Sequence, residues 1–416
     1  MAPRTLPPEL VADVLDLFVE ANPSHAARLP NLASFARVNQ TWSARATAYL
    51  YRNLYLDSSA RAGILDALEA NPSLALHVRS LTLSGGKLDA DEFARLRRVL
   101  AQCPAVRSLS YHCFDAVYLA DLTAFISAAW PGLRYLRADQ SQHLFDLLNR
   151  LPDLEELVAS HIQFPAAAHN LVTATATPLP PSRPATPGVS GASTPVPSAA
   201  PVRPTFRLKR FDSGSSPSPL NFHLLTSSSQ SSLRTLDLPI SSLTSQDLGS
   251  FTSLSSLTLT LAERYLPLDA DLPQPRPAGA PGSGRSDTRC LRRLRRVLAG
   301  AEAAGVPLRR LEVYEPRYAP TSAFAAHAFE EEDLFASVPA SVETLDLATL
   351  AVALEYVEEA FRRGEQGEGA EGEEERPRVC EGLKTLVLGR GSVGSAAQVR
   401  RTLEVLARRG VAVRWE

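Results

Sequence analysis

The sequence predicts an α/β protein in which a short N-terminal module of helices precedes a long solenoid of parallel strands and helices. Two observations predict this fold class: a short apolar phrase recurs through most of the 416 residues, and amphipathic segments stand between its copies. A third observation divides the array, because three segments are too rich in Pro, Gly, Ser or Glu to add to a core.

The N-terminal residues 1–57 predict three short helices. Two prolines directly after Leu6 suit a first helical turn, where the missing N–H is not needed. Apolar residues then recur at helical spacing as far as Phe18. Residues 31–38 and 40–51 continue the pattern as a second and a third helix.

From residue 58 onward one phrase recurs: an apolar residue, two others, an apolar residue, one other and an apolar residue. Its last three positions alternate as a strand does, which points two apolar side chains inward. The copies begin at Val78, Val106, Leu133, Leu154, Leu233, Leu254, Leu308, Val342 and Leu383, and a weaker copy spans 207–211. A final strand is expected at 411–416.

Helical segments stand between these strands. One runs from Asp91 to Leu100, and two more lie before Leu308 and after Leu388. The residues expected on their buried faces are Phe93, Leu96, Val99 and Leu100; Leu291, Leu294, Val297 and Leu298; and Val399, Leu403 and Leu406. One strand and one helix cannot bury their apolar sides alone, so the units are expected to stack with strands on the concave side and helices outside.

Three segments interrupt the array: 172–205, 267–288 and 364–377. None holds enough large apolar side chains to offset the entropy lost on ordering, so each is predicted to be a disordered insertion. The array is therefore divided into parts at 58–171, 206–266 and 289–416, the last of which contains the acidic loop.

The repeated phrase resembles the leucine-rich-repeat family over roughly residues 58–416. The family usually places an asparagine three residues after the last leucine of the phrase. This chain instead has Gly86, Ser141, Ser241, Pro316 and Gly391 at that position. The repeats are therefore expected to be irregular in register and curvature.

The N-terminal module is similar to the F-box pattern, through Leu6-Pro7-x-Glu9-Leu10-Val11-x-x-Val14-Leu15 and then Leu32-x-x-Phe35-x-x-Val38-x-x-x-Trp42. The resemblance implies a face for a Skp-type adaptor, which joins a cullin scaffold in a ubiquitin ligase. It assigns to the adaptor-facing set Leu6, Pro7, Leu10, Val11, Val14 and Leu15, and to the internal core of the module Phe35, Val38 and Trp42. Asn39 departs from the pattern, since many members have a cysteine there.

Outward residues of the predicted strands form the candidate surface for a protein substrate. Tyrosine and arginine are the types that most often contribute interface energy. The candidates are Tyr135, Arg137, Asp139, Arg310, Glu312 and Tyr314. The sequence does not identify that substrate.

We expect no enzyme activity and no cofactor. Gly389-x-Gly391-x-x-Gly394 follows a strand, as in a dinucleotide-binding fingerprint, but it also follows a copy of the repeat phrase. The histidines lack metal-ligand spacing, and the four cysteines are scattered as free thiols are. Near-neutral charge gives no sign of nucleic acid, and there is no apolar run long enough for a membrane span.

The favoured hypothesis is therefore the substrate-recognition subunit of an SCF-type (Skp-cullin-F-box) ubiquitin ligase in the cytoplasm or nucleus. A second hypothesis is a non-catalytic leucine-rich-repeat scaffold whose N-terminal helices only cap the solenoid. A third, a nucleotide-dependent enzyme, depends on the C-terminal glycines alone.

Overall fold

The computed structural model describes most of the chain in two compact units, Met1–Ser160 and His161–Glu416. The described residues are 6–22, 25–84, 88–112, 116–139, 143–159, 206–213, 219–244, 247–261, 287–314, 334–350, 352–365, 380–389, 392 and 394–416. The predicted insertion at 172–205 lies outside them. So do most of the insertions predicted at 267–288 and 364–377, although helices reach into the end of the first and the start of the second.

Unit 1 begins with three helices, as predicted: α1 (Pro8–Ala21), α2 (His25–Phe35) and α3 (Gln40–Arg52). Pro8 occupies the first turn of α1, where a missing N–H costs nothing. Asn39 caps α3, because its side-chain oxygen accepts a hydrogen bond from the backbone N–H of Trp42 at 3.1 Å. The residue that departs from the F-box pattern therefore starts the third helix.

The three helices share a small core of their own. Val11, Leu15, Leu32 and Ala46 are buried, and the partly buried Phe18, Phe35, Ala36, Trp42, Tyr49 and Leu50 pack around them. The ring of Phe35 lies 5.4 Å from that of Phe18 and 5.3 Å from that of Trp42. Phe35 and Trp42 thus pack in the interior, as predicted. Val38 does not, since it lies in the turn after α2 with 59% of its surface exposed, so its assignment to the core was wrong.

Parallel strands follow in unit 1, each opposite its neighbour in register. They are β1 (Asn53–Leu56), β2 (Ser80–Ser84), β3 (Ser108–His112), β4 (Tyr135–Ala138) and β5 (Glu156–Ala159). Between them come α4 (Arg61–Ala70), η1 (Pro72–His77), α5 (Ala90–Leu100), η2 (Ala116–Tyr118), α6 (Leu119–Ala129) and α7 (Leu144–Leu148). The sequence pattern predicted β2 to β5, whereas β1 lies inside the segment assigned to the helical module.

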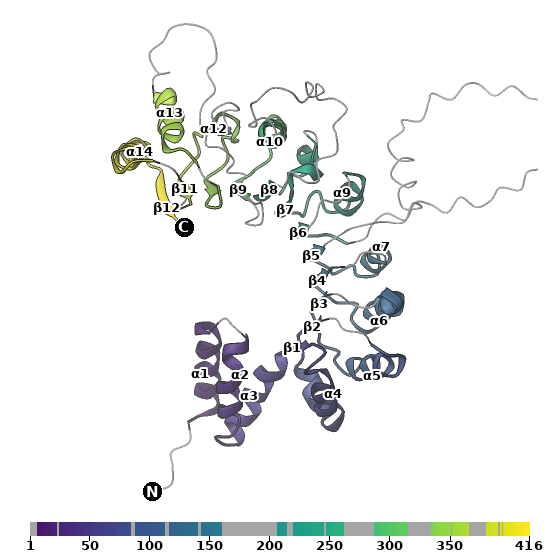
Figure 1. Ribbon diagram of the computed structural model, residues 1–416. Coiled ribbons are helices and arrows are strands. Elements are labelled where there is room, and N and C mark those ends of the chain that lie inside the picture. Colours follow the sequence, from purple (N-terminus) through teal and green to yellow (C-terminus); the bar gives the residue numbers. More distant parts are fainter. Residues whose placement is uncertain are drawn as a thin grey trace, which may run out of the picture. The chain divides into compact units, whose positions relative to one another are not determined.

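The core of unit 1 lies between its strands and the helices on one side of them (Figure 1). Leu81, Leu109, Leu136 and Leu157 stand opposite one another on successive strands and are fully buried. The predicted buried face of α5, from Phe93 to Leu100, packs onto this layer. The other side chains of each strand therefore point to the opposite side of the sheet. We call this side the strand face.

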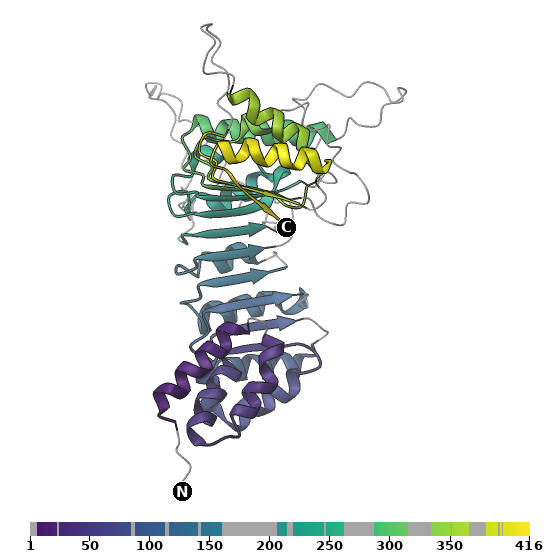
Figure 2. The ribbon, with the colours of Figure 1, turned by 90° about the vertical axis from the view of Figure 1, so that its left-hand side faces the viewer.

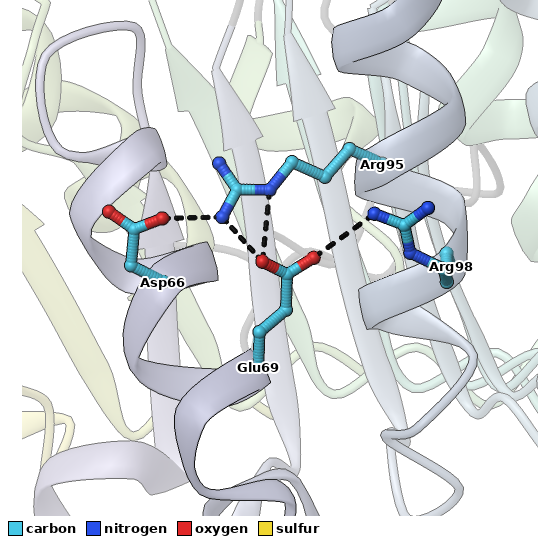
Figure 3. A network of polar contacts seen from close by, with 4 residues as sticks. All are labelled: Asp66, Glu69, Arg95 and Arg98. Atoms are coloured by element: carbon cyan, nitrogen blue, oxygen red, sulfur yellow. Dashed lines mark hydrogen bonds and ion pairs between the residues drawn. The ribbon is translucent and has the colours of Figure 1, made fainter.

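Charged side chains join α4 to α5 on the helix side (Figure 3). Arg95 bonds both Asp66, at 2.5 Å, and Glu69, at 2.6 Å, while Arg98 reaches Glu69 at 3.3 Å. The hydrogen bond from Arg95 holds the pKa of Glu69 below its usual range, and the two acids raise the pKa of Arg95. Neighbouring repeats are thus linked by a surface ion-pair network as well as by packing.

Unit 2 repeats the same layered arrangement of parallel strands. Its strands are β6 (Arg210–Ser213), β7 (Thr235–Pro239), β8 (Ser256–Thr260), β9 (Arg310–Tyr314), β10 (Thr344–Leu347), β11 (Thr385–Leu388) and β12 (Ala412–Trp415). Its helices are α9 (Pro219–Thr226), η3 (Ile240–Ser242), η4 (Asp247–Ser250), α10 (Asp287–Ala303), α12 (Leu334–Ser337), α13 (Leu354–Glu365) and α14 (Ala396–Arg408). Figure 2 shows α13 and α14 side by side over the last strands. Each predicted strand of this part is present, including the weak copy at β6.

The buried face of α14 differs from the predicted one. Thr402, Val405 and Leu406 are buried, whereas Leu403 is 37% exposed. A threonine can take the inner position because its hydroxyl donates to the backbone carbonyl of Leu354 at 3.3 Å. That hydrogen bond joins α14 to α13, and Thr402 occupies the inner position that was expected for Leu403.

Candidate functional site

An apolar stripe on α1 is the first candidate site. It consists of Leu6, Leu10, Val14 and Leu17, whose side chains are 48%, 47%, 42% and 65% exposed. The spacing of four and three residues places Leu10, Val14 and Leu17 along one line of α1, and Leu6 lies two residues before the helix begins. Pro7, beside Leu6, is exposed as well. We call these four residues the α1 stripe.

Val11 and Leu15 do not belong to that surface, although the F-box resemblance assigned them to it. Both are 0% exposed and lie in the core of the module. They fall one position along from Leu10 and Val14, which turns them about 100° around the helix and toward α2 and α3. Leu17 takes their place on the outer side. The helical spacing indicated this stripe, but not which side of α1 faces inward.

The orientation of α1 is further fixed by Tyr49 of α3. Its hydroxyl donates to a carboxylate oxygen of Asp16. Burial, together with this bond to Asp16, raises the pKa of Tyr49 to about 12. The phenol thus remains a donor, and α1 is bonded to α3 on the side away from the α1 stripe.

The helical module is joined to the strands of unit 1 through α3. This helix packs on η1 and runs directly into β1, the first strand of the sheet. The backbone N–H of Arg79, just before β2, donates to the carbonyl of Arg52 at the end of α3 at 2.9 Å. The α1 stripe therefore belongs to a helix bundle that is continuous with the repeats.

The strand face of unit 1 is the second candidate site. It brings together Tyr135, Arg137 and Asp139, as predicted, beside two polar residues of β3. The ring of His112 is held on both sides: Ser110 Oγ lies 2.7 Å from Nε2, and Asp139 Oδ2 lies 2.7 Å from Nδ1. With Nδ1 donating to the carboxylate, Nε2 accepts the hydroxyl hydrogen of Ser110.

This order of groups is also that of a serine-hydrolase triad. Ser110, however, lies within an inner strand with partners on both sides, so the neighbouring backbone N–H groups serve the sheet. A reactive serine also needs paired donors for the oxyanion, which a regular strand does not supply. We therefore interpret the arrangement as one that fixes the orientation of the His112 ring and occupies the carboxylate of Asp139 with a hydrogen bond.

The strand face of unit 2 holds the other three predicted residues, Arg310, Glu312 and Tyr314. Arg310 is paired with Glu312 at 3.4 Å and with Asp346 of β10 at 3.3 Å. Carboxylates of β6, β7, β9 and β10 stand at equivalent positions, namely Asp212, Asp237, Glu312 and Asp346. This row is mainly acidic, a property that single phrases of the sequence did not reveal because its members are far apart along the chain.

The C-terminal glycines are explained by packing. A Cβ on Gly389 would lie 2.0 Å from the backbone oxygen of Ala348, and one on Gly394 would lie 2.8 Å from Leu354. Gly391 lies outside the described residues. Both described glycines thus allow β11 and the chain after it to approach the preceding repeat closely.

Within the described part of the chain, no group of three or more His, Cys, Asp or Glu side chains is placed to hold a metal ion. No described helix is both long and apolar enough to cross a membrane.

Comparison with known proteins gives a weak structural likeness. No family model matches the sequence, and no curated protein matches it. A similar solved structure is the leucine-rich repeat-containing protein LegL7 from Legionella pneumophila, 14% identical over 87% of this chain and 89% of that chain, with a TM-score of 0.41. So low an identity bears on no substrate or partner of this protein.

Proposed function

We propose that this protein is the substrate-recognition subunit of an SCF-type ubiquitin ligase, with the helical module binding a Skp-type adaptor and the strand faces binding a protein substrate. The α1 stripe is the observation that supports this role. Four large aliphatic side chains remain between 42% and 65% exposed on a module that has a core of its own. An apolar line of this kind is typical of a surface that another protein covers.

The stripe alone does not make a stable complex. Full burial of an aliphatic side chain contributes roughly 1.5 to 3 kcal/mol. Since about half of each side chain is already covered, the four together would contribute roughly 3 to 6 kcal/mol. Association costs at least about 4 kcal/mol. An adaptor must therefore contact further surface beside the α1 stripe, and Pro7 and Val38 are exposed residues of the same module.

A binding experiment with purified Skp-type adaptor tests the proposal. The wild type should co-purify with the adaptor, and the double variant Leu10→Asp/Val14→Asp should not, because it places two charges in the buried interface. The matched control is Leu76→Asp/Leu403→Asp, which adds the same charges at exposed apolar positions of η1 and α14. The proposed ligase role is refuted if the wild-type protein does not bind the adaptor, or if the double variant still binds it.

The cap hypothesis is supported by a different observation, the packing of α3 on η1 beside the first strand. Removing residues 1–56 does not discriminate between the two hypotheses, because it would also remove β1 from the sheet. Outward substitutions do discriminate. A cap needs only the inward residues such as Leu15, so the Leu10→Asp/Val14→Asp variant would then fold and bind every partner as the wild type does.

A further inference from the structure

Among the described residues, Arg137 on the strand face of unit 1 has no charged partner. Arg137 occupies the exposed position of β4, and within the described residues no hydrogen bond or ion pair engages its guanidinium. The nearby carboxylate of Asp139 is bonded to His112. Arg310, on the strand face of unit 2, differs, since it pairs with two acids. Because the guanidinium of Arg137 has no such partners, its N–H donors are available to a ligand.

The neighbours of Arg137 in its row carry hydroxyl groups. The register places Thr82 of β2, Ser110 of β3 and Arg137 opposite one another on adjacent strands. Both hydroxyls thus lie in the same row as the guanidinium, at steps of about 4.8 Å. Because the hydroxyl hydrogen of Ser110 is directed to His112, Thr82 is the hydroxyl that can donate to a ligand. A planar guanidinium beside hydroxyls is suited to a carboxylate or phosphate group, which Arg can bind through two parallel hydrogen bonds.

The same row also ends in an aromatic residue. Tyr55 of β1 stands opposite Thr82 and is 49% exposed. From Tyr55 to Arg137 there are three strand steps, or about 14 Å, which an extended peptide spans with about four residues. Tyrosine and arginine are also the side chains that most often anchor an interface.

We propose that this row, Tyr55–Thr82–Ser110–Arg137, binds an extended segment of a partner protein that carries an acidic group about four residues from an apolar side chain. The inference rests on the proposed function in one respect, that the strand face receives a protein. The acidic group binds at Arg137 through its oxyanion, and the apolar side chain packs on the ring of Tyr55. Glutamate, aspartate and a phosphorylated residue share the chemistry required.

Selection from a library of random displayed decapeptides on the full-length protein tests the proposal. Enriched peptides should carry an acid about four positions from an aromatic or aliphatic residue. Arg137→Ala should weaken a selected peptide about tenfold or more, as expected for a lost charge-assisted pair, and Tyr55→Ala should weaken it as well. Arg134→Ala, an exposed arginine just before β4, is the matched control and should bind as the wild type does.

Variants of the selected peptide identify the source of the charge. Replacing its acid by glutamine should abolish binding, whereas phosphoserine should retain it, and the tighter of the two charged forms names the preferred group. The proposal is overturned if no peptide is enriched, if enriched peptides lack an acid, if Arg137→Ala binds them normally, or if single-stranded RNA competes for the row at equal concentration. Thermal unfolding should be unchanged in Arg137→Ala, since no described hydrogen bond or ion pair is lost.

The outcome can be separated from that of the ligase proposal. No adaptor is present in the selection, and Leu10→Asp/Val14→Asp should leave peptide binding intact because the α1 stripe shares no residue with the row. If the protein binds the peptides but not the adaptor, this inference stands and the ligase proposal is refuted.

Discussion

The acidic row of unit 2 makes stability depend on pH, and Asp237 is where this dependence is strongest. Asp237 of β7 lies directly opposite Asp212 of β6, with Glu312 two strands away. Burial, followed by repulsion from Asp212 and Glu312, raises the pKa of Asp237 to about 7, against a small opposing effect of Arg210. The folded protein therefore holds a proton on Asp237 at pH values where the unfolded chain has released it.

The sign and size of the effect follow from that difference. A group whose pKa is raised on folding contributes stability that is complete below the unfolded pKa of 3.8 and is lost as the pH rises through about 7. Three pKa units at about 1.4 kcal/mol each give roughly 4 kcal/mol as an upper bound. The carboxyl group is partly exposed on the strand face, so screening by solvent reduces the expected loss to about 1 to 2 kcal/mol.

Asp237→Asn removes the titration while keeping the shape of the side chain. Urea-induced unfolding of the wild type and the variant, followed by circular dichroism, should show a difference in free energy that moves by about 1 to 2 kcal/mol in favour of the variant between about pH 4.5 and pH 8.5. Glu404→Gln on the exposed side of α14 is the control for loss of a carboxylate. Equal pH dependence of the wild type and Asp237→Asn would refute the reasoning.

Two further predictions concern unit 2. The hydrogen bond from His223 to the buried Asp247, at 3.1 Å, raises the pKa of His223, so the pair stabilises the fold below that pKa and this contribution disappears as the pH rises through it. His223→Asn should abolish that part of the dependence, seen as a smaller change in Tm between about pH 6 and pH 9. Gly389→Ala should destabilise the protein by about 1 to 3 kcal/mol, because its Cβ would meet the Ala348 oxygen. Gly63→Ala in α4, where no atom lies within 4 Å, should be neutral or stabilising by up to about 1 kcal/mol in the same thermal unfolding assay.

The repeat fold could be predicted because each phrase carries its own signal. Leu81, Leu109 and Leu136 recur with the same neighbours, and a strand of this type needs little more than alternation to be recognised. Strand β1 was not predicted, because its three-residue pattern at Leu54 follows directly after a helix, with no turn between them. Its pairing with β2, and not its own sequence, places it in the sheet.

The candidate sites were less predictable, since they depend on which residues face each other across strands. The sequence marks both Arg137 and Arg310 as outward residues of the repeat phrase, although Arg310 takes the position that Tyr135 has in the phrase of Arg137. Only the structure shows that Asp346 pairs with Arg310, whereas Asp139 is bonded to His112 and Arg137 has no ion-pair partner among the described residues. A difference of this kind arises from partners 27 to 36 residues away in the chain, beyond the reach of any local pattern.

Helix α1 separates stability from partner binding, because its two faces serve different purposes. Leu15 is 0% exposed in the module core, so Leu15→Ala leaves a cavity and should cost about 2 to 5 kcal/mol. Leu10 is 47% exposed, and Leu10→Ala should change stability by less than about 1 kcal/mol while weakening adaptor binding. Thermal unfolding and adaptor binding measured on both variants check the division. Equal destabilisation by the two substitutions would mean that the α1 stripe packs against this chain itself, and a covered stripe has no surface left for an adaptor.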